Sequence, residues 1–149
     1  MNLKEYRQKR DFKQTSEPEG EPDFTVGSHF VVQKHQARQL HYDFRLEMGG
    51  VLKSWAVPKG VPLDPGIRRL AIQVEDHPID YIDFAGVIPV GQYGAGTVEI
   101  WDRGDFKLDR EEPDHLEFTL IGEKLSGDYA LIHTRSKNWL LIKRKARAE

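Results

Sequence analysis

The chain has 149 residues, a length typical of one ordinary domain that can bury a sizeable hydrophobic core. Its 22 Lys and Arg residues nearly balance its 24 Asp and Glu residues, so a net charge of −2 excludes a globally basic nucleic-acid-binding protein and leaves that role only to a local patch. The absence of cysteine excludes disulfides, thiolate metal sites and a cysteine nucleophile, which leaves His and carboxylate groups as metal ligands.

The N-terminal segment, residues 1–28, is charged and poor in branched aliphatic residues. Residues 4–12 predict a short helix, and residues 15–23 (TSEPEGEPD) predict an extended acidic loop. We expect an arm that is part of the active domain, followed by a core over residues 29–149. The N-terminus lacks the apolar segment of a signal peptide, and no run approaches the roughly 18 apolar residues of a membrane span, so we expect a soluble, cytoplasmic protein with no membrane partner.

From residue 30 onward, short runs rich in β-branched and aromatic residues replace this composition. No segment has a long helical period, and the connections are rich in Gly and Pro. This pattern predicts a mainly β protein, an antiparallel β-barrel of about eight strands with a few short helices. The predicted strands cover residues 30–34, 40–47, 51–57, 70–75, 97–101, 116–121, 129–134 and 139–143.

Two short connections predict tight hairpins, at Gly49-Gly50 and at residues 136–138. A third segment, residues 86–96 (GVIPVGQYGAG), contains four glycines, which permit positive-φ turns or a close backbone approach. It is not a phosphate-binding P-loop, because the Gly-Lys-Ser/Thr ending and the following helix are absent.

The most informative strand is the one over residues 40–47. Side chains alternate between the two faces of a strand, so His41, Asp43 and Arg45 share one face, while Leu40, Tyr42, Phe44 and Leu46 share the other. Residues two apart lie roughly 6–7 Å from each other, which lets His41 and Asp43 converge on one ion. A hydrogen-bonded surface histidine is the simpler interpretation of the His-x-Asp pattern alone.

The neighbouring strand strengthens the metal hypothesis, because Gln33 and His35 also share one face there. A set of two histidines and one carboxylate suits Mn, Fe, Co or Zn and leaves coordination positions open for substrate. After the strand over 70–75, His77 and Tyr81 are expected on a loop at a strand end, where binding groups are often displayed; a simple polar turn is the alternative. Lys59, Arg68 and Arg69 could add positive charge, although isolated basic residues are usually solvated.

Several motifs together resemble one known family. They are FVVQKHQARQLHYDFRLE, WAVPKG, RRLA, VEDHPIDY, GVIPVGQYGAGTVEIWDRG and WLLIK, and the arm YRQKRDFKQTSEPEG extends the similarity to nearly the whole chain. They resemble the 3′-phosphoesterase domain of ligase D, from the bacterial end-joining repair ligases. No ligase or polymerase sequence accompanies these motifs, so we expect the form of this domain that occurs as a free-standing protein.

The resemblance implies a metal-dependent enzyme that heals DNA 3′ ends by removing a terminal ribonucleoside and then the 3′-phosphate. His35, His41 and Asp43 match the family's metal ligands, with Mn²⁺ as the usual ion and Co²⁺ or Zn²⁺ as other candidates. Arg45, His77 and Tyr81 match residues of the phosphate site. Residues matching other positions important for activity or substrate binding are Gln33, Lys59 and Arg69 and, for the ribonucleoside-removing step, Arg10, Asp11 and Glu17. The implied partners are DNA or DNA/RNA 3′ ends, a separate ATP-dependent ligase and a polymerase.

Two other functions fit parts of the pattern. His41 and Asp43 with the distant His133 form the facial triad of Fe(II) oxygenases on β-barrels, and Arg135 would anchor a carboxylate substrate. This alternative leaves His35, His77 and Lys59 unused. The third possibility is a non-catalytic barrel that grips a nucleic-acid backbone through Arg and Lys, which the near-neutral charge disfavours.

Overall fold

The computed structural model describes residues 3–20 and 28–145. Within these residues the chain is mainly β, as predicted, with two short helices. The predicted acidic loop over residues 15–23 lies partly outside the described residues. The elements in chain order are α1 (Lys4–Gln8), β1 (His29–Gln36), β2 (Leu40–Met48), β3 (Val51–Val57), β4 (Arg68–His77), the 3-10 helix η1 (Ile79–Asp83), β5 (Gly86–Ile88), β6 (Gly96–Glu112), β7 (His115–Gly122), β8 (Ser126–Arg135) and β9 (Asn138–Lys143).

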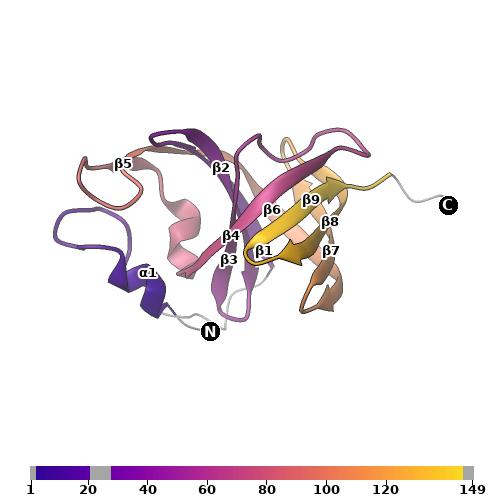
Figure 1. The fold of residues 1–149 in the computed structure, drawn as a ribbon, viewed down its shortest axis with the longest axis horizontal. Coiled ribbons are helices and arrows are strands. Elements are labelled where there is room, and N and C mark those ends of the chain that lie inside the picture. The colour runs from indigo at the N-terminus through magenta and orange to yellow at the C-terminus, as the bar shows by residue number, and fades with distance from the viewer. Residues whose placement is uncertain (1–2, 21–27, 146–149) are drawn as a thin grey trace.

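Eight of these strands close into an antiparallel barrel, which confirms the predicted architecture. The strands are hydrogen-bonded in the order β1-β2-β3-β4-β9-β8-β7-β6, and β6 pairs back onto β1 to complete the ring. The remaining strand, β5, adds to the edge of β6. Figure 1 shows α1 and β5 on one side of the molecule and β7, β8 and β9 on the other.

The interior of the barrel is packed with hydrophobic side chains from every barrel strand. On β2, Phe44 and Leu46 point inward and are fully buried, while Tyr42 packs at the margin of this core. Fully burying one such side chain contributes roughly 1.5–3 kcal/mol. The predicted alternation of β2 is therefore confirmed, with one correction: Leu40 is 47% exposed, because it lies at the first position of the strand, beyond the packed interior.

A second hydrophobic cluster lies on the outer face of the barrel wall. Tyr6 from α1, Tyr81 from η1 and Ile88 from β5 pack there with Leu52 and Val98 of the wall. The arm was expected to lie outside the core, yet Leu3 and Tyr6 are buried. The arm thus builds a small core of its own against the barrel, and α1 contacts β4.

The hairpin predictions are confirmed, whereas three other expectations are corrected. Gly49 and Gly50 both have positive φ in a two-residue turn that joins β2 to β3, and Ser136 has positive φ in the turn before β9. The N-terminal helix ends at Gln8, well before residue 12. β6 has 17 residues where five were predicted, and β5 was not predicted at all.

The sequence predicted only the first part of β6, because charged residues such as Asp102, Arg103 and Asp105 interrupt the apolar pattern of the strand beyond residue 101. The strand pairs with β1 and β5 along its first part and with β7 along its second part, and β1 comes from a distant part of the chain. Neither helix in the described residues is long and apolar enough to cross a membrane.

Candidate metal and phosphate site

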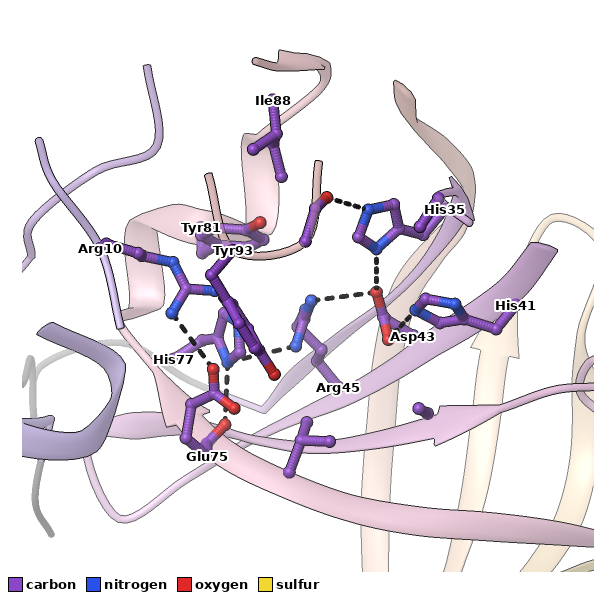
Figure 2. A pocket seen from close by; sticks show the side chains of 14 residues that line it. Arg10, His35, His41, Asp43, Arg45, Glu75, His77, Tyr81, Ile88 and Tyr93 are labelled. Carbon is purple, nitrogen blue, oxygen red and sulfur yellow. Dashed lines mark hydrogen bonds and ion pairs between the residues drawn. The ribbon is translucent and has the colours of Figure 1, made fainter. Parts of the chain in front are cut away.

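The candidate site is a cavity of about 290 Å³ on the outer face of the barrel wall. Figure 2 shows its side chains, from the arm, β1, β2, β4, η1 and the segment before β6, pointing toward a common space. The cavity is lined by Arg10, His35, Ala37, His41, Asp43, Arg45, Ala56, Val74, Glu75, His77, Tyr81, Ile88, Tyr93 and Gly94.

His35, His41 and Asp43 come together at one end of this cavity. β1 and β2 are antiparallel neighbours, and His35 is paired directly with His41. The Nδ1 atom of His35 lies 3.3 Å from Asp43 Oδ2, and the Nε2 atom of His41 lies 3.2 Å from Asp43 Oδ1. One potential ligand atom from each residue lies within 4.8 Å of the other two.

Backbone carbonyls fix which ring nitrogen of each histidine faces the carboxylate. A carbonyl only accepts, so His35 Nε2 donates to Gly94 O at 2.6 Å and His41 Nδ1 donates to Gln39 O at 3.2 Å. In the neutral rings these contacts leave His35 Nδ1 and His41 Nε2 available to bind an ion beside Asp43; in a protonated ring the same nitrogen donates to the Asp43 carboxylate instead. A backbone hydrogen bond to the other ring nitrogen is the arrangement by which proteins orient metal-binding histidines.

This donor set fits a divalent cation. Two atoms bound to one ion at about 2.1 Å stand roughly 3 Å apart, close to the separations between Asp43 and the two histidines. Burial raises the pKa of Asp43, but the charge of Arg45 and the hydrogen bonds with His35 and His41 outweigh it and hold that pKa far below its usual range. Asp43 is therefore ionised at any physiological pH and could serve as a ligand.

Arg45 lies next to this triad and is almost fully buried. Its Nε donates to Gln33 Oε1 at 2.7 Å, so the two Nη atoms face the cavity. Nη2 is 3.5 Å from Asp43 Oδ2, and Nη1 is 3.2 Å from His77 Nδ1. The guanidinium also lies over the Tyr81 ring, 4.9 Å from its centroid. A guanidinium held in this way is suited to bind two oxygens of a phosphate at once.

His77 reaches the cavity because β4 has a bulge. Leu52 pairs with His77 and Ser54 pairs with Val74, so β4 has one extra residue between these pairs. The bulge turns both Val74 and His77 toward the cavity, where strict alternation would separate them. His77 was expected on a loop, and the structure instead places it at the last position of β4.

The surroundings of His77 favour its neutral form. Burial lowers the pKa of His77 well below its usual value, and the charges of Arg45 and Arg10 lower it further. Its Nδ1 donates to the Glu75 carbonyl at 2.9 Å, which leaves Nε2 unprotonated, 3.4 Å from Arg10 Nη2. A bound anion between these groups would offset the two arginine charges and favour protonation of His77.

The arm closes the other end of the cavity through Arg10. Its Nε donates to Glu17 Oε2 at 2.9 Å, and its Nη1 donates to Glu75 Oε2 at 3.1 Å. Glu17 also accepts from the Tyr81 hydroxyl at 2.8 Å. Burial raises the pKa of Tyr81 well above its usual value, so the hydroxyl stays protonated and keeps donating.

Three further residues of the predicted site, Gln33, Glu17 and Asp11, do not line the cavity. Gln33 is fully buried. Its side-chain oxygen accepts from Arg45, and its side-chain nitrogen donates to the carbonyls of Tyr81 and Phe84. Glu17 is buried behind Arg10 and Tyr81. Asp11 is exposed, and its carboxylate accepts from the backbone of Lys13.

Lys59 and Arg69 also lie outside the cavity lining. Arg69 donates to the carbonyls of Lys59 and Gly60, so its guanidinium fixes the turn after β3. The oxygenase triad is not assembled: His133 lies on β8 with its ring 5.1 Å from that of Trp139, and its Nε2 donates to Ser136 O. Within the described residues, the cluster able to hold a metal contains His35 rather than His133.

Among the lining residues that were not singled out from the sequence, three interact with other residues of the site: Glu75, Tyr93 and Gly94. Glu75 precedes His77 at the bulge of β4, and the other two lie in the glycine-rich segment before β6. The glycine density was a usable signal, since Gly94 has a φ of +75° and its carbonyl reaches His35. Nothing local to Glu75 indicated that Arg10 would pair with it from 65 residues away.

The fold and the site define a closed β-barrel protein whose outer wall bears a triad of potential metal ligands beside a buried arginine. The sequence model of the family described as the DNA ligase D 3′-phosphoesterase domain matches residues 33–133. The chain belongs to this family.

Relatives include multifunctional non-homologous end joining proteins LigD from several bacteria. The chain is 55% identical to the Pseudomonas aeruginosa protein and 47% identical to the Mycolicibacterium smegmatis protein, in each case over 96% of its length. It is 46% identical to a Mycobacterium tuberculosis DNA repair protein LigD over 93% of its length. The chain spans only about a fifth of these relatives, 18–20% of their lengths.

Proposed function

We propose that the protein is a metal-dependent phosphoesterase that heals DNA 3′ ends for repair synthesis or ligation. It would remove a 3′-terminal ribonucleoside as a phosphodiesterase and a 3′-phosphate as a phosphomonoesterase, leaving a 3′-OH. The observation that supports this most is the juxtaposition of the triad with Arg45 and His77 in one cavity of a family member. DNA or DNA/RNA 3′ ends are the proposed substrates, and a separate ligase and polymerase are the proposed partners.

In this proposal His35, His41 and Asp43 hold the ion, with Mn²⁺ favoured and Co²⁺ or Zn²⁺ compatible with the same donors. A divalent ion bound there supplies Lewis-acid polarisation of a phosphoryl oxygen and activation of water. Arg45 binds two of the phosphate oxygens and stabilises the charge that develops on them. Gln33 holds Arg45 in the orientation that makes this possible.

His77 has two candidate roles, as an imidazolium that stabilises the phosphate oxygens or as a general acid that protonates the leaving oxygen. A substrate with an activated leaving group separates them. If His77 is the acid, His77→Gln loses much less activity on a nitrophenyl ester than on a nucleoside ester. If it stabilises the phosphate, both substrates lose activity equally.

We further propose that the arm, residues 1–28, belongs to the active domain together with the core over 29–149. Arg10 supports this, because it reaches His77 and Glu75 directly, and Glu17 positions both Arg10 and Tyr81. Asp11 would act through the fold of the arm. Lys59 and Arg69 would act outside the cavity, Arg69 by holding the turn that presents Lys59.

The decisive experiment incubates the protein with a primer-template that ends in one ribonucleotide or in a 3′-phosphate, with and without Mn²⁺. We expect Mn²⁺-dependent conversion of both ends to a 3′-OH. Binding without any change in either end would refute this function and favour a non-catalytic nucleic-acid-binding barrel.

Variants of the site are expected to separate metal binding from turnover. His41→Ala and Asp43→Ala should lose Mn²⁺ binding, measured by calorimetry, together with activity. Arg45→Ala should keep the metal and lose turnover, because its guanidinium is assigned to the phosphate. Full activity of Asp43→Ala after EDTA treatment would refute the metal assignment.

A further inference from the structure

Tyr93 presents an exposed aromatic ring in the lining of the candidate site. Tyr93 as a whole is 46% exposed, although it borders the cavity. Its loop, residues 89–95, is ordered by hydrogen bonds from Gln92 N to Pro89 O and from Ala95 N to Gln92 O, both at 3.1 Å. An aromatic face that is fixed in place and open to solvent is available for a planar ligand group.

The two ends of the cavity differ in charge. Toward the triad, the positive charges of Arg45 and the proposed divalent ion outweigh the single negative charge of Asp43. Toward the arm, the positive charges of Lys9 and Arg10 are balanced by Glu17 and Glu75, with Lys9 Nζ 3.2 Å from Glu75 Oε1. A phosphate is therefore attracted to Arg45, whereas the arm end suits an uncharged part of the substrate.

Tyr93 belongs to the arm end. Lys9 Nζ lies 3.4 Å from the Tyr93 hydroxyl and 4.7 Å from the ring centroid, and the Arg10 guanidinium lies 5.4 Å from the same centroid. Figure 2 shows Tyr93 on the side of the cavity that holds Arg10 and Glu75, away from His35 and His41. A group that extends from a phosphate at Arg45 toward Arg10 would therefore lie near the Tyr93 ring.

We propose that Tyr93 is a specificity-determining residue that stacks on the base of the 3′-terminal nucleoside in the phosphodiester substrate. This inference rests on the proposed function and extends it. Stacking accepts any base, because every base has a π-face. A 3′-phosphate end has no such nucleoside beyond the phosphate, so Tyr93 would serve the diester reaction alone.

A binding experiment tests the contact without relying on turnover. A primer-template ending in a 2-aminopurine ribonucleotide is mixed rapidly with Mn²⁺-loaded protein, and the fluorescence of the terminal base is followed before turnover. We expect quenching by the wild type and by Tyr93→Phe, and little quenching by Tyr93→Ala. Val90→Ala is the matched control, since Val90 is 97% exposed on the same loop and does not line the cavity.

Kinetics then distinguish this role from a structural one. Tyr93→Ala should lower kcat/KM for the ribonucleotide end by roughly 5- to 100-fold, mainly through KM, and leave the 3′-phosphate end unchanged. An abasic terminal riboside should cost the wild type a similar factor and cost Tyr93→Ala nothing more. Mn²⁺ affinity should not change in this variant, although its neighbour Gly94 contacts His35.

Equal loss on both ends, no loss on either end, or weakened Mn²⁺ binding would overturn the role of Tyr93. If the wild type converts neither end, the proposed function itself fails. The two failures are thus distinguishable.

Discussion

Each histidine of the triad has one ring nitrogen hydrogen-bonded to a backbone carbonyl, which leaves the other nitrogen for an ion. Gly94 O fixes His35, and Gln39 O fixes His41. Because these hydrogen bonds are part of the fold, they hold the rings in the orientation that a bound ion would need. Of the two carbonyls, that of Gly94 depends on an unusual backbone conformation.

Gly94→Ala is expected to weaken Mn²⁺ binding roughly tenfold, as measured by calorimetry. Gly94 has a φ of +75°, a conformation that strains any residue with a side chain, and a Cβ atom there would touch His35 Cε1 at 3.4 Å, so a backbone shift that relieves the strain would also move the carbonyl that holds His35. Gly91→Ala is the control, because Gly91 has a φ of +93° but a Cβ there meets nothing within 4 Å. An equal loss in both variants would show that loop strain, rather than the His35 contact, sets the affinity.

At the scale of elements, the arm depends on a single buried aromatic residue for much of its docking. Tyr6 is fully buried, its ring packs against those of Phe12, His77 and Tyr81, and its hydroxyl donates to Pro18 O. The same helix precedes Arg10, so docking of the arm also places this guanidinium over the cavity.

Tyr6→Ala is expected to detach the arm while the barrel stays folded, because truncating such a ring costs roughly 3–5 kcal/mol, and the barrel core contains no arm residue. Limited proteolysis should then cleave within residues 3–20, and the near-UV circular dichroism of the buried tryptophans should persist. Tyr6→Phe should resist cleavage far better. Loss of the barrel signal together with the arm would contradict this independence.

Local sequence patterns were sufficient to predict the centre of the site. The alternation of β2 put His41, Asp43 and Arg45 on one face, and the structure confirms that face. It could not show that this face lies outside the barrel, because both faces of β2 are covered: one by the interior and the other by the arm and η1.

The other residues of the site depend on long-range contacts. Residues 33 and 77 are brought to Arg45 by barrel pairing and by a bulge, and a bulge has no reliable local signal at Glu75. The resemblance to the family supplied Arg10 and Glu17, but it could not show that Glu17 acts through Arg10 and Tyr81.

At the scale of the whole molecule, the closed barrel buries Tyr129 in its interior. The side chain is fully buried and donates to Pro62 O at 2.7 Å, which ties the connection between β3 and β4 to β8. Burial, with a smaller contribution from the charge of Asp102, raises the pKa of Tyr129 to about 12.

This shift predicts a loss of stability at high pH. The folded pKa lies above the unfolded value near 10, so the stabilisation is complete below pH ~10 and declines as the pH rises toward 12, by up to about 3 kcal/mol. In urea unfolding at pH 8, Tyr129→Phe should be less stable than the wild type by about 1 kcal/mol. At pH 11.5 the difference should vanish or reverse; an unchanged difference would contradict the assignment.

One face of β2 packs in the barrel core and the other lines the cavity, and this limits which insertions and deletions the strand can tolerate. Phe44 and Leu46 face the packed interior, while Asp43 and Arg45 face the cavity, and the four residues alternate without a gap. Inserting or deleting one residue before Asp43 would exchange the two faces and place a carboxylate and a guanidinium in the barrel interior. In a library of single-residue insertions and deletions, this strand should therefore tolerate fewer changes than the loops that complete the cavity.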